Sequence, residues 1–141
     1  MRTLVKVLVA TLLALVLLPL VYFHWHSDQA SSLALLRGAI QLGHVPSGLV
    51  EVEPGRLMLD ARQVAANGVS AFRHPGLEQY LGARGWQFAD QMGAGLNFTR
   101  GNQRLHGLLT SCGPHYMVVV LEQDPVTGRD VHLPRPFNLF R

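Results

Sequence analysis

The residues best suited to chemistry in this sequence are one thiol and two imidazoles in its C-terminal third. Cys112 and His115 lie in the segment SCGPHY, and His106 precedes them on the same run of chain. A C-x-x-H spacing can offer two metal ligands from one turn, with His106 as a third. The same residues could instead provide a cysteine nucleophile and a histidine base. They define one hypothesis: a small hydrolase or metal-binding protein that uses Cys112, His106 and His115.

Neither chemical set is complete in the sequence. Zinc sites usually have three or four protein ligands, and no second paired motif accompanies this one. No Asn or Asp is obviously placed to orient a histidine base. Residues 112–115, C-G-P-H, resemble the C-G-P-C active site of thioredoxins over four residues, but His115 replaces the second thiol and a β-like apolar run follows. The leading prediction therefore has no catalytic residues, no metal and no cofactor.

The stretch GWQFADQMGAGLNFTRGN, residues 85–102, contains the second group of candidates. Its G-x-G lacks the third glycine of a dinucleotide fingerprint, because Phe98 stands there. Strict alternation predicts instead a half-buried strand region with an apolar core face, formed by Trp86, Phe88, Met92, Leu96 and Phe98. Asp90 shares that parity and is its odd polar member. We therefore predict that any binding site on this strand contains Asp90 and the adjacent Gln91.

An N-terminal apolar segment determines on which side of a membrane all of these residues lie. Residues 7–23 carry no charge, and residues 4–23 are long enough to cross a bilayer core of about 20 residues. The aromatic residues Tyr22, Phe23 and Trp25 follow as an interfacial belt would. The exit HWHSDQASS has no small-x-small cleavage site at its end. The sequence favours an uncleaved signal anchor at residues 7–26 over a cleaved signal peptide or a buried helix.

The flanking charges predict the orientation of this anchor. Arg2 and Lys6 precede the apolar segment, and the first basic residue after it is Arg37. The positive-inside rule then places residues 1–6 in the cytoplasm and the C-terminal domain outside it, in a single-pass topology. The net charge of +3 comes mostly from the first six residues, since ten basic residues face nine acidic ones without them. No basic stripe for nucleic acid is expected.

Turn signals and periodicity predict an α+β domain of short helices on an antiparallel meander of three to four strands. Residues 27–45 read as a connector and a helix, 46–125 as the domain, and 126–141 as a C-terminal tail. Short helices are expected after Asp60, as an N-cap with Gln63 as its capping partner, and after Pro75. The run YMVVVL, apolar on both faces, is typical of a central strand.

Three turns predict the register of the strands. Pro54-Gly55 predicts a hairpin that pairs Val52 with Leu57 and places Val50, Val52, Leu57 and Leu59 on one face. Gly101-Asn102 predicts a two-residue turn that pairs 98 with 105, 96 with 107 and 94 with 109. At residues 93–95 we expect either a three-residue turn or a kinked continuous strand with glycine bulges. Asn97 opens a formal N-F-T glycosylation sequon, which lies inside a predicted strand.

These observations favour a non-enzymatic accessory or interaction module, held at a lipid bilayer through residues 4–23 and directed at envelope or membrane protein partners. The incomplete chemical sets and the small size of the domain support this interpretation. The hydrolase or metal-binding protein built on Cys112, His106 and His115 is the alternative.

Overall fold

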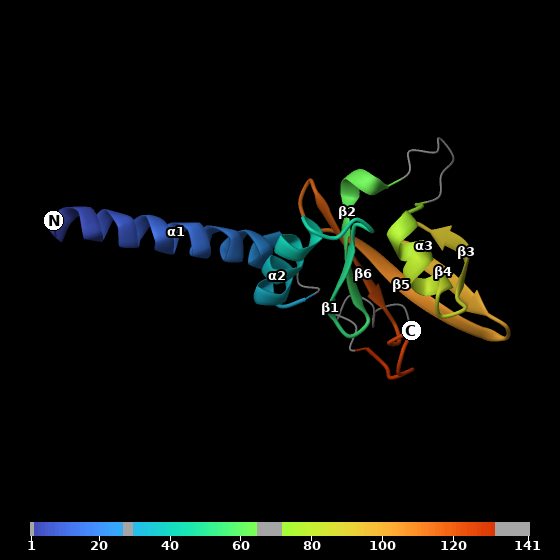
Figure 1. The fold of residues 1–141 in the computed structure, drawn as a ribbon. Helices are drawn as coiled ribbons and strands as arrows, with labels where there is room; N and C mark the ends of the chain where they lie inside the picture. The colour runs from blue at the N-terminus through green and yellow to red at the C-terminus, as the bar shows by residue number, and fades with distance from the viewer. Residues whose placement is uncertain (1, 27–29, 65–71, 132–141) are drawn as a thin grey trace.

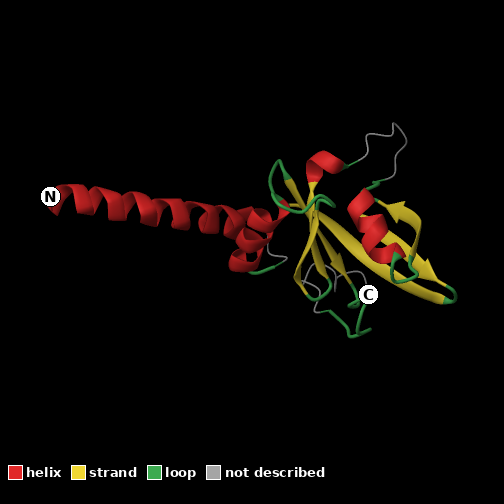
Figure 2. Cartoon of the chain, viewed as in Figure 1, coloured by secondary structure: helices red, strands yellow, loops and turns green. Residues whose placement is uncertain are grey.

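One long helix projects from a mixed α+β body (Figures 1 and 2). The structure, a computed structural model, describes residues 2–26, 30–64 and 72–131. Helix α1 is Arg2–His26, and its segment Leu4–Tyr22 has a mean hydropathy of 2.7. By length and composition, this segment is sufficient to cross a membrane. The side chains of Phe23 and Trp25 lie outside the described part of the chain.

In the described part of the chain, the body contains one antiparallel sheet of six strands, where the sequence predicted three or four. The strand order is β1-β2-β6-β5-β4-β3. The apolar run of β6 is central in this order, as predicted, and β1 and β3 are the edges. The strands are β1 Leu49–Glu53, β2 Arg56–Asp60, β3 Gln87–Met92, β4 Gly95–Arg100, β5 Gln103–Ser111 and β6 Tyr116–Leu121.

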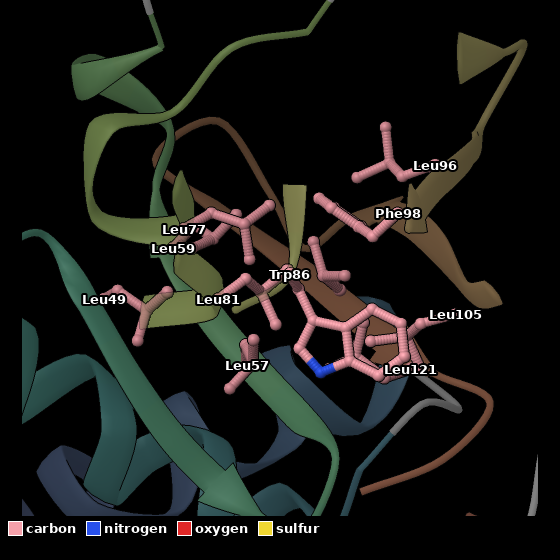
Figure 3. Close-up of a cluster of buried hydrophobic side chains, with 11 residues drawn as sticks. Leu49, Leu57, Leu59, Leu77, Leu81, Trp86, Leu96, Phe98, Leu105 and Leu121 are labelled. Atoms are coloured by element: carbon pink, nitrogen blue, oxygen red, sulfur yellow. The ribbon is translucent and has the colours of Figure 1, made fainter. Parts of the chain in front are cut away.

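Two helices cover the sheet from opposite sides (Figure 1). Helix α3, Pro75–Gly82, packs on the face that we call the α3 face, where Leu77 and Leu81 join a core drawn from five strands (Figure 3). Helix α2, Ser32–Leu42, packs on the other side, the α2 face, through Leu35 and Leu42. Its buried residues come from α2, β2, β6 and Cys112 directly after β5, and Val50 and Val52 of β1 pack against them. Among the described helices, none packs on the α2 face of β3 and β4.

Local signals explain where these helices begin. The Ser31 side chain accepts a hydrogen bond from the Ala34 amide, which caps α2. Pro75 occupies the first turn of α3, where its missing N–H is not needed. Gly38 lets α2 approach the sheet, because a Cβ there would collide with the Val52 side chain. The α2 interface therefore depends on a residue without a side chain.

The β1–β2 hairpin differs from the predicted register beyond its turn. Glu53 pairs with Arg56, but an irregularity between Glu51 and Glu53 shifts the ladder so that Glu51 faces Leu57. The four apolar residues assigned to one face therefore divide between two. Leu57 and Leu59 join the core of the α3 face, whereas Val50 and Val52 pack against the core of the α2 face.

The β3–β4 hairpin also departs from prediction, and both expected forms of residues 93–95 are wrong. Met92 pairs with Gly95 across a two-residue turn, which puts Gln91 opposite Leu96. A bulge between Phe88 and Asp90 inverts the parity of the strand. Asp90 is therefore exposed on the α2 face rather than part of the core face. Met92, predicted in the core, is 78% exposed.

The β4–β5 hairpin follows the prediction from Gly101-Asn102. Phe98 pairs with Leu105 and Leu96 with Gly107. The Leu109 amide donates to the Ala94 carbonyl, which extends the same register. Trp86, Leu96 and Phe98 are buried together on the α3 face, as expected.

Two predicted segments are only partly described. Asp60 caps a 3-10 turn, η1 Ala61–Gln63, by accepting from the Arg62 amide. Val64 then has an extended backbone, so the predicted helix does not continue there, and its last residues, 65 and 66, lie outside the described residues. The tail assigned to 126–141 begins as a packed loop, since the Val131 amide donates to the Glu122 carbonyl. Residues 132–141 lie outside the described chain.

His74 joins α3 to β2 through a buried imidazole that is 1% exposed. Its Nδ1 accepts from the Leu77 amide at 3.3 Å and caps the helix. The Nε2–H therefore donates to the Asp60 carbonyl at 3.3 Å. Burial lowers the pKa of His74 below its ordinary 6.5, against the opposing influence of that hydrogen bond and of the Asp60 and Glu78 charges.

Trp86→Ala or Phe98→Ala should each destabilise the domain by about 3–5 kcal/mol, because each leaves a cavity in the α3-face core. Met92→Ala is the matched control, since its side chain is exposed. Chemical denaturation monitored by circular dichroism measures the three variants. Normal unfolding midpoints for both aromatic variants would contradict the core assignment.

The buried neutral His74 predicts that stability falls on mild acidification. Between the lowered pKa of the folded state and pH 6.5, the unfolded chain binds a proton at this histidine and the folded chain does not. Its contribution is therefore complete above pH 6.5 and is lost as the pH falls toward the lowered pKa of the folded state. The pKa values of Asp60 and Asp124 are lowered from 3.8, so their losses come at more acidic pH.

Urea unfolding at pH 7.5 and pH 5.5 measures this effect. His74→Asn should reduce the difference between the two midpoints, whereas His44→Asn, at an exposed position, should leave it unchanged. An undiminished difference in the His74 variant would show that another group is responsible.

Candidate functional site

A row of three polar side chains crosses the α2 face on adjacent strands. Asp90 of β3 pairs with Asn97 of β4, and Asn97 pairs with His106 of β5. Directly opposed residues of an antiparallel sheet have Cβ atoms about 4.5–5.5 Å apart. The Asn97 Nδ2 donates to Asp90 Oδ1, and the Asn97 Oδ1 bonds to His106 Nδ1. We call these three residues the polar row.

The chemistry of the polar row selects one tautomer of the histidine. An aspartate carboxylate accepts hydrogen bonds, so the NH₂ group of Asn97 must face Asp90. The amide oxygen of Asn97 then faces His106 and can only accept. In the neutral ring, the single proton must therefore lie on Nδ1 of His106. In that form Nε2 of this exposed side chain carries a lone pair.

Rigid elements hold this row. The two-residue turn at Gly101-Asn102 sets the β4–β5 register, and the bulge before Asp90 turns its carboxylate toward Asn97. On the far side, the Glu122 amide donates to the His106 carbonyl, so the end of β6 continues the sheet beside the histidine. An imidazole fixed in this way can accept a hydrogen bond or a proton at Nε2.

The structure separates Cys112 from the polar row. Cys112 follows β5 directly, has an exposed fraction of 0%, and belongs to the core of the α2 face. It lies six residues along the chain from His106, or about 20 Å at the rise of a strand. His115 is exposed in the turn before β6, and its carbonyl accepts from the Ala61 amide. Cys112 and His106 are therefore too far apart to act as a nucleophile and its base.

The remaining candidates have structural contacts. Gln91 lies on the α3 face, where its Oε1 accepts from the Phe72 amide at 2.5 Å and its Nε2 donates to the Gly93 carbonyl at 2.7 Å. It does not join Asp90, because neighbours on a strand point to opposite faces. Within the described chain, no three His, Cys, Asp or Glu side chains gather to hold a metal ion.

A second polar feature is a pocket of about 460 Å³ beside the β4–β5 turn. Arg100 stacks over the Trp86 ring at 4.4 Å and bonds to Gln103 Oε1 at 3.0 and 2.9 Å. Asp124 also lines the pocket, and hydrogen bonds from the Thr127 hydroxyl and from backbone amides lower its pKa. The buried Nε1 of Trp86 has no hydrogen-bond partner among the residues that the structure describes. Arg100 and Asp124 thus bond mainly to other residues that line the same pocket.

Sequence reasoning missed Asn97 and the charged pocket. In the sequence Asn97 stands out only as part of a sequon, although the predicted pairing of 98 with 105 already places it opposite His106. The bulge concealed its other neighbour, Asp90. The pocket residues come from β4, β5 and the loop after β6, and no local spacing connects them.

Comparisons with protein families, with curated proteins and with solved structures give no match for this chain.

The tautomer of His106 can be measured directly. Nitrogen-15 spectra of the histidine rings should show His106 with Nδ1 protonated and Nε2 unprotonated near pH 8, with His106→Gln identifying the signals. Asn97→Leu removes the acceptor and should produce a mixture of tautomers. Thr99→Val, on the same strand and face, is the matched control. A protonated Nε2 in the unaltered protein would refute the arrangement of the polar row.

Proposed function

We propose that this chain is a membrane-anchored accessory module whose α+β domain stands outside the cytoplasm and binds an envelope or membrane protein. The observation that carries the proposal is the exposure of α1. Every described side chain from Leu4 to Leu18 is exposed, and no residue of the apolar segment is fully buried in the described chain, although Tyr22 at its end packs against the core of the α2 face. A continuous apolar surface of this length is unfavourable in water and suits a bilayer core.

The charges around α1 support the proposed orientation. Arg2 and Lys6 precede the apolar segment, and no basic residue follows it until Arg37. Basic residues are retained on the cytoplasmic side, so the domain is exported. The N-terminus lies inside and residues 46–125 lie outside in this proposal.

The polar row supports a binding role for the domain. It lies on the half of the α2 face that no described helix covers, and three strands hold it rigidly. A protein partner that donates a hydrogen bond to Nε2 of His106 would meet an acceptor already oriented by Asn97 and Asp90. Such preorganisation lowers the cost of ordering side chains on association.

One observation favours a second candidate function, a hydrolase that uses His106 as a base. Its oriented imidazole is of the kind that general-base catalysis uses. Cys112 is buried, which counts against it as a nucleophile, so this candidate uses His106 as the base and water as the nucleophile. The accessory module needs nothing beyond the hydrogen-bonding groups that the polar row presents.

A reporter fusion tests the topology. Alkaline phosphatase, which folds only outside the cytoplasm, should be active when fused after residue 141, and a fluorescent protein active only inside should stay dark there. Replacing Arg2 and Lys6 with Glu should reduce the phosphatase activity, because it removes the charges that retain the N-terminus. Replacing the exposed Arg129 and Arg104 with Glu is the control for charge alone. Cytoplasmic fluorescence of the unaltered fusion would contradict the proposal.

A further inference from the structure

Helix α2 has two contrasting sides. Leu35, Gly38 and Leu42 are buried against the sheet. The opposite side carries Leu33, which is 70% exposed, and Ile40, which is 62% exposed, with the exposed Arg37 between them. Residues at i, i+4 and i+7 lie on one stripe of a helix. We call these three residues the outer stripe of α2.

The outer stripe has no partner within the described chain. Leu33 and Ile40 are large apolar side chains left open, and Arg37 makes no hydrogen bond or ion pair with any described residue. An exposed apolar stripe with a basic residue at its centre suits a surface that is apolar below and anionic above. The acyl boundary and the phosphate layer of a membrane have that arrangement.

The position of α2 beside α1 points to the same surface. The two helices are in contact, and α2 lies beside the C-terminal end of α1 and next to the sheet (Figure 1). The apolar segment of α1 ends at Tyr22, which packs against the core of the α2 face. A Cβ at Gly113 would collide with the Tyr22 hydroxyl, so the β5–β6 turn also rests on this end of α1. The side of α2 away from the sheet therefore lies near the end of α1, at the height where α1 would leave a bilayer.

We propose that α2 is an interfacial helix that lies in the headgroup layer of the membrane that α1 spans. Leu33 and Ile40 insert to the acyl boundary, and Arg37 pairs with lipid phosphates. This inference rests on the proposed function, because it requires α1 to cross the bilayer. It adds that the domain is seated on the membrane surface at α2, rather than suspended from a linker above it.

Depth-dependent quenching tests the proposal on the full chain in phosphatidylcholine–phosphatidylglycerol liposomes. An environment-sensitive fluorophore is attached to single cysteines introduced by Leu12→Cys, Ile40→Cys or Asn102→Cys in a Cys112→Ala background. Position 12 reports the spanning segment, position 40 the outer stripe, and position 102 the β4–β5 turn at the end of the molecule far from α1 (Figure 1). Because Cys112 is fully buried, the unaltered background provides a second set if Cys112→Ala does not fold.

Nitroxide lipids should quench positions 12 and 40 strongly and position 102 weakly, whereas aqueous iodide should quench position 102 most. Arg37→Glu should weaken the lipid quenching at position 40 in anionic liposomes, and Arg129→Glu, the control, should not. If position 12 is quenched by lipid but position 40 behaves as position 102, the interfacial helix is refuted and the anchor stands. If position 12 escapes lipid quenching, the proposed function itself fails.

A second copy of the chain is the competing occupant of the outer stripe. Oxidation of the Ile40→Cys protein at low protein-to-lipid ratio distinguishes it. A disulfide-linked dimer formed rapidly and in high yield, together with weak lipid quenching, would overturn the proposal in favour of a dimer interface. A protein that stays monomeric and is quenched by lipid supports it.

Discussion

The fold depends on the burial of two adjacent strands, β2 and β6, from both sides. Leu57 and Val119 face the core under α3, and Met58 and Val118 face the core under α2; all four have an exposed fraction of 0%. Burial of each such side chain is worth about 1.5–3 kcal/mol. Neither helix could cover both faces of this pair, so α2 and α3 are both needed. The outer strands on one side, β3 and β4, are then free to present polar groups on the α2 face.

The sequence predicts the features that local rules determine. The two-residue turn at Gly101-Asn102 fixes the β4–β5 register, and the double-faced apolar run of β6 identifies a central strand. The sequence does not reveal the two irregularities, near Val52 and before Asp90, because one extra residue in a strand leaves the apolar pattern on each side intact while it exchanges the faces. Met92 and Asp90 were placed on the wrong face for this reason. The sequence predicts too few strands because no local signal shows that β2 pairs with the distant strand β6.

The candidate site was predictable in part, and the limit is again geometric. His106 and Asp90 were both singled out from sequence, but as members of different groups. What joins them is Asn97, whose two ends bond to different strands. To predict this contact, both the β3–β4 and the β4–β5 register must be predicted correctly. The alternation of apolar residues does not reveal the bulge, so it gives the wrong β3–β4 register. Conversely, the C-x-x-H spacing drew attention to Cys112, although the turn before β6 directs its side chain into the core and leaves His115 exposed.

The contact between Gly113 and Tyr22 has a consequence for how the proposed module would meet its partner. A domain on a flexible linker samples a volume set by linker length, and its binding surface points in every direction. Here the turn before β6 contacts the end of α1, so in the proposed anchored state α1 would set the height and tilt of the domain above the membrane. A partner diffusing in the same bilayer would find the polar row at a constant distance from the membrane. The rotational freedom of the anchored domain would already be restricted before the partner binds. The domain would sample a smaller volume than one on a flexible linker, but its binding surface would keep one orientation. This arrangement suits a membrane protein partner whose binding site lies at a fixed height, rather than a partner captured from solution.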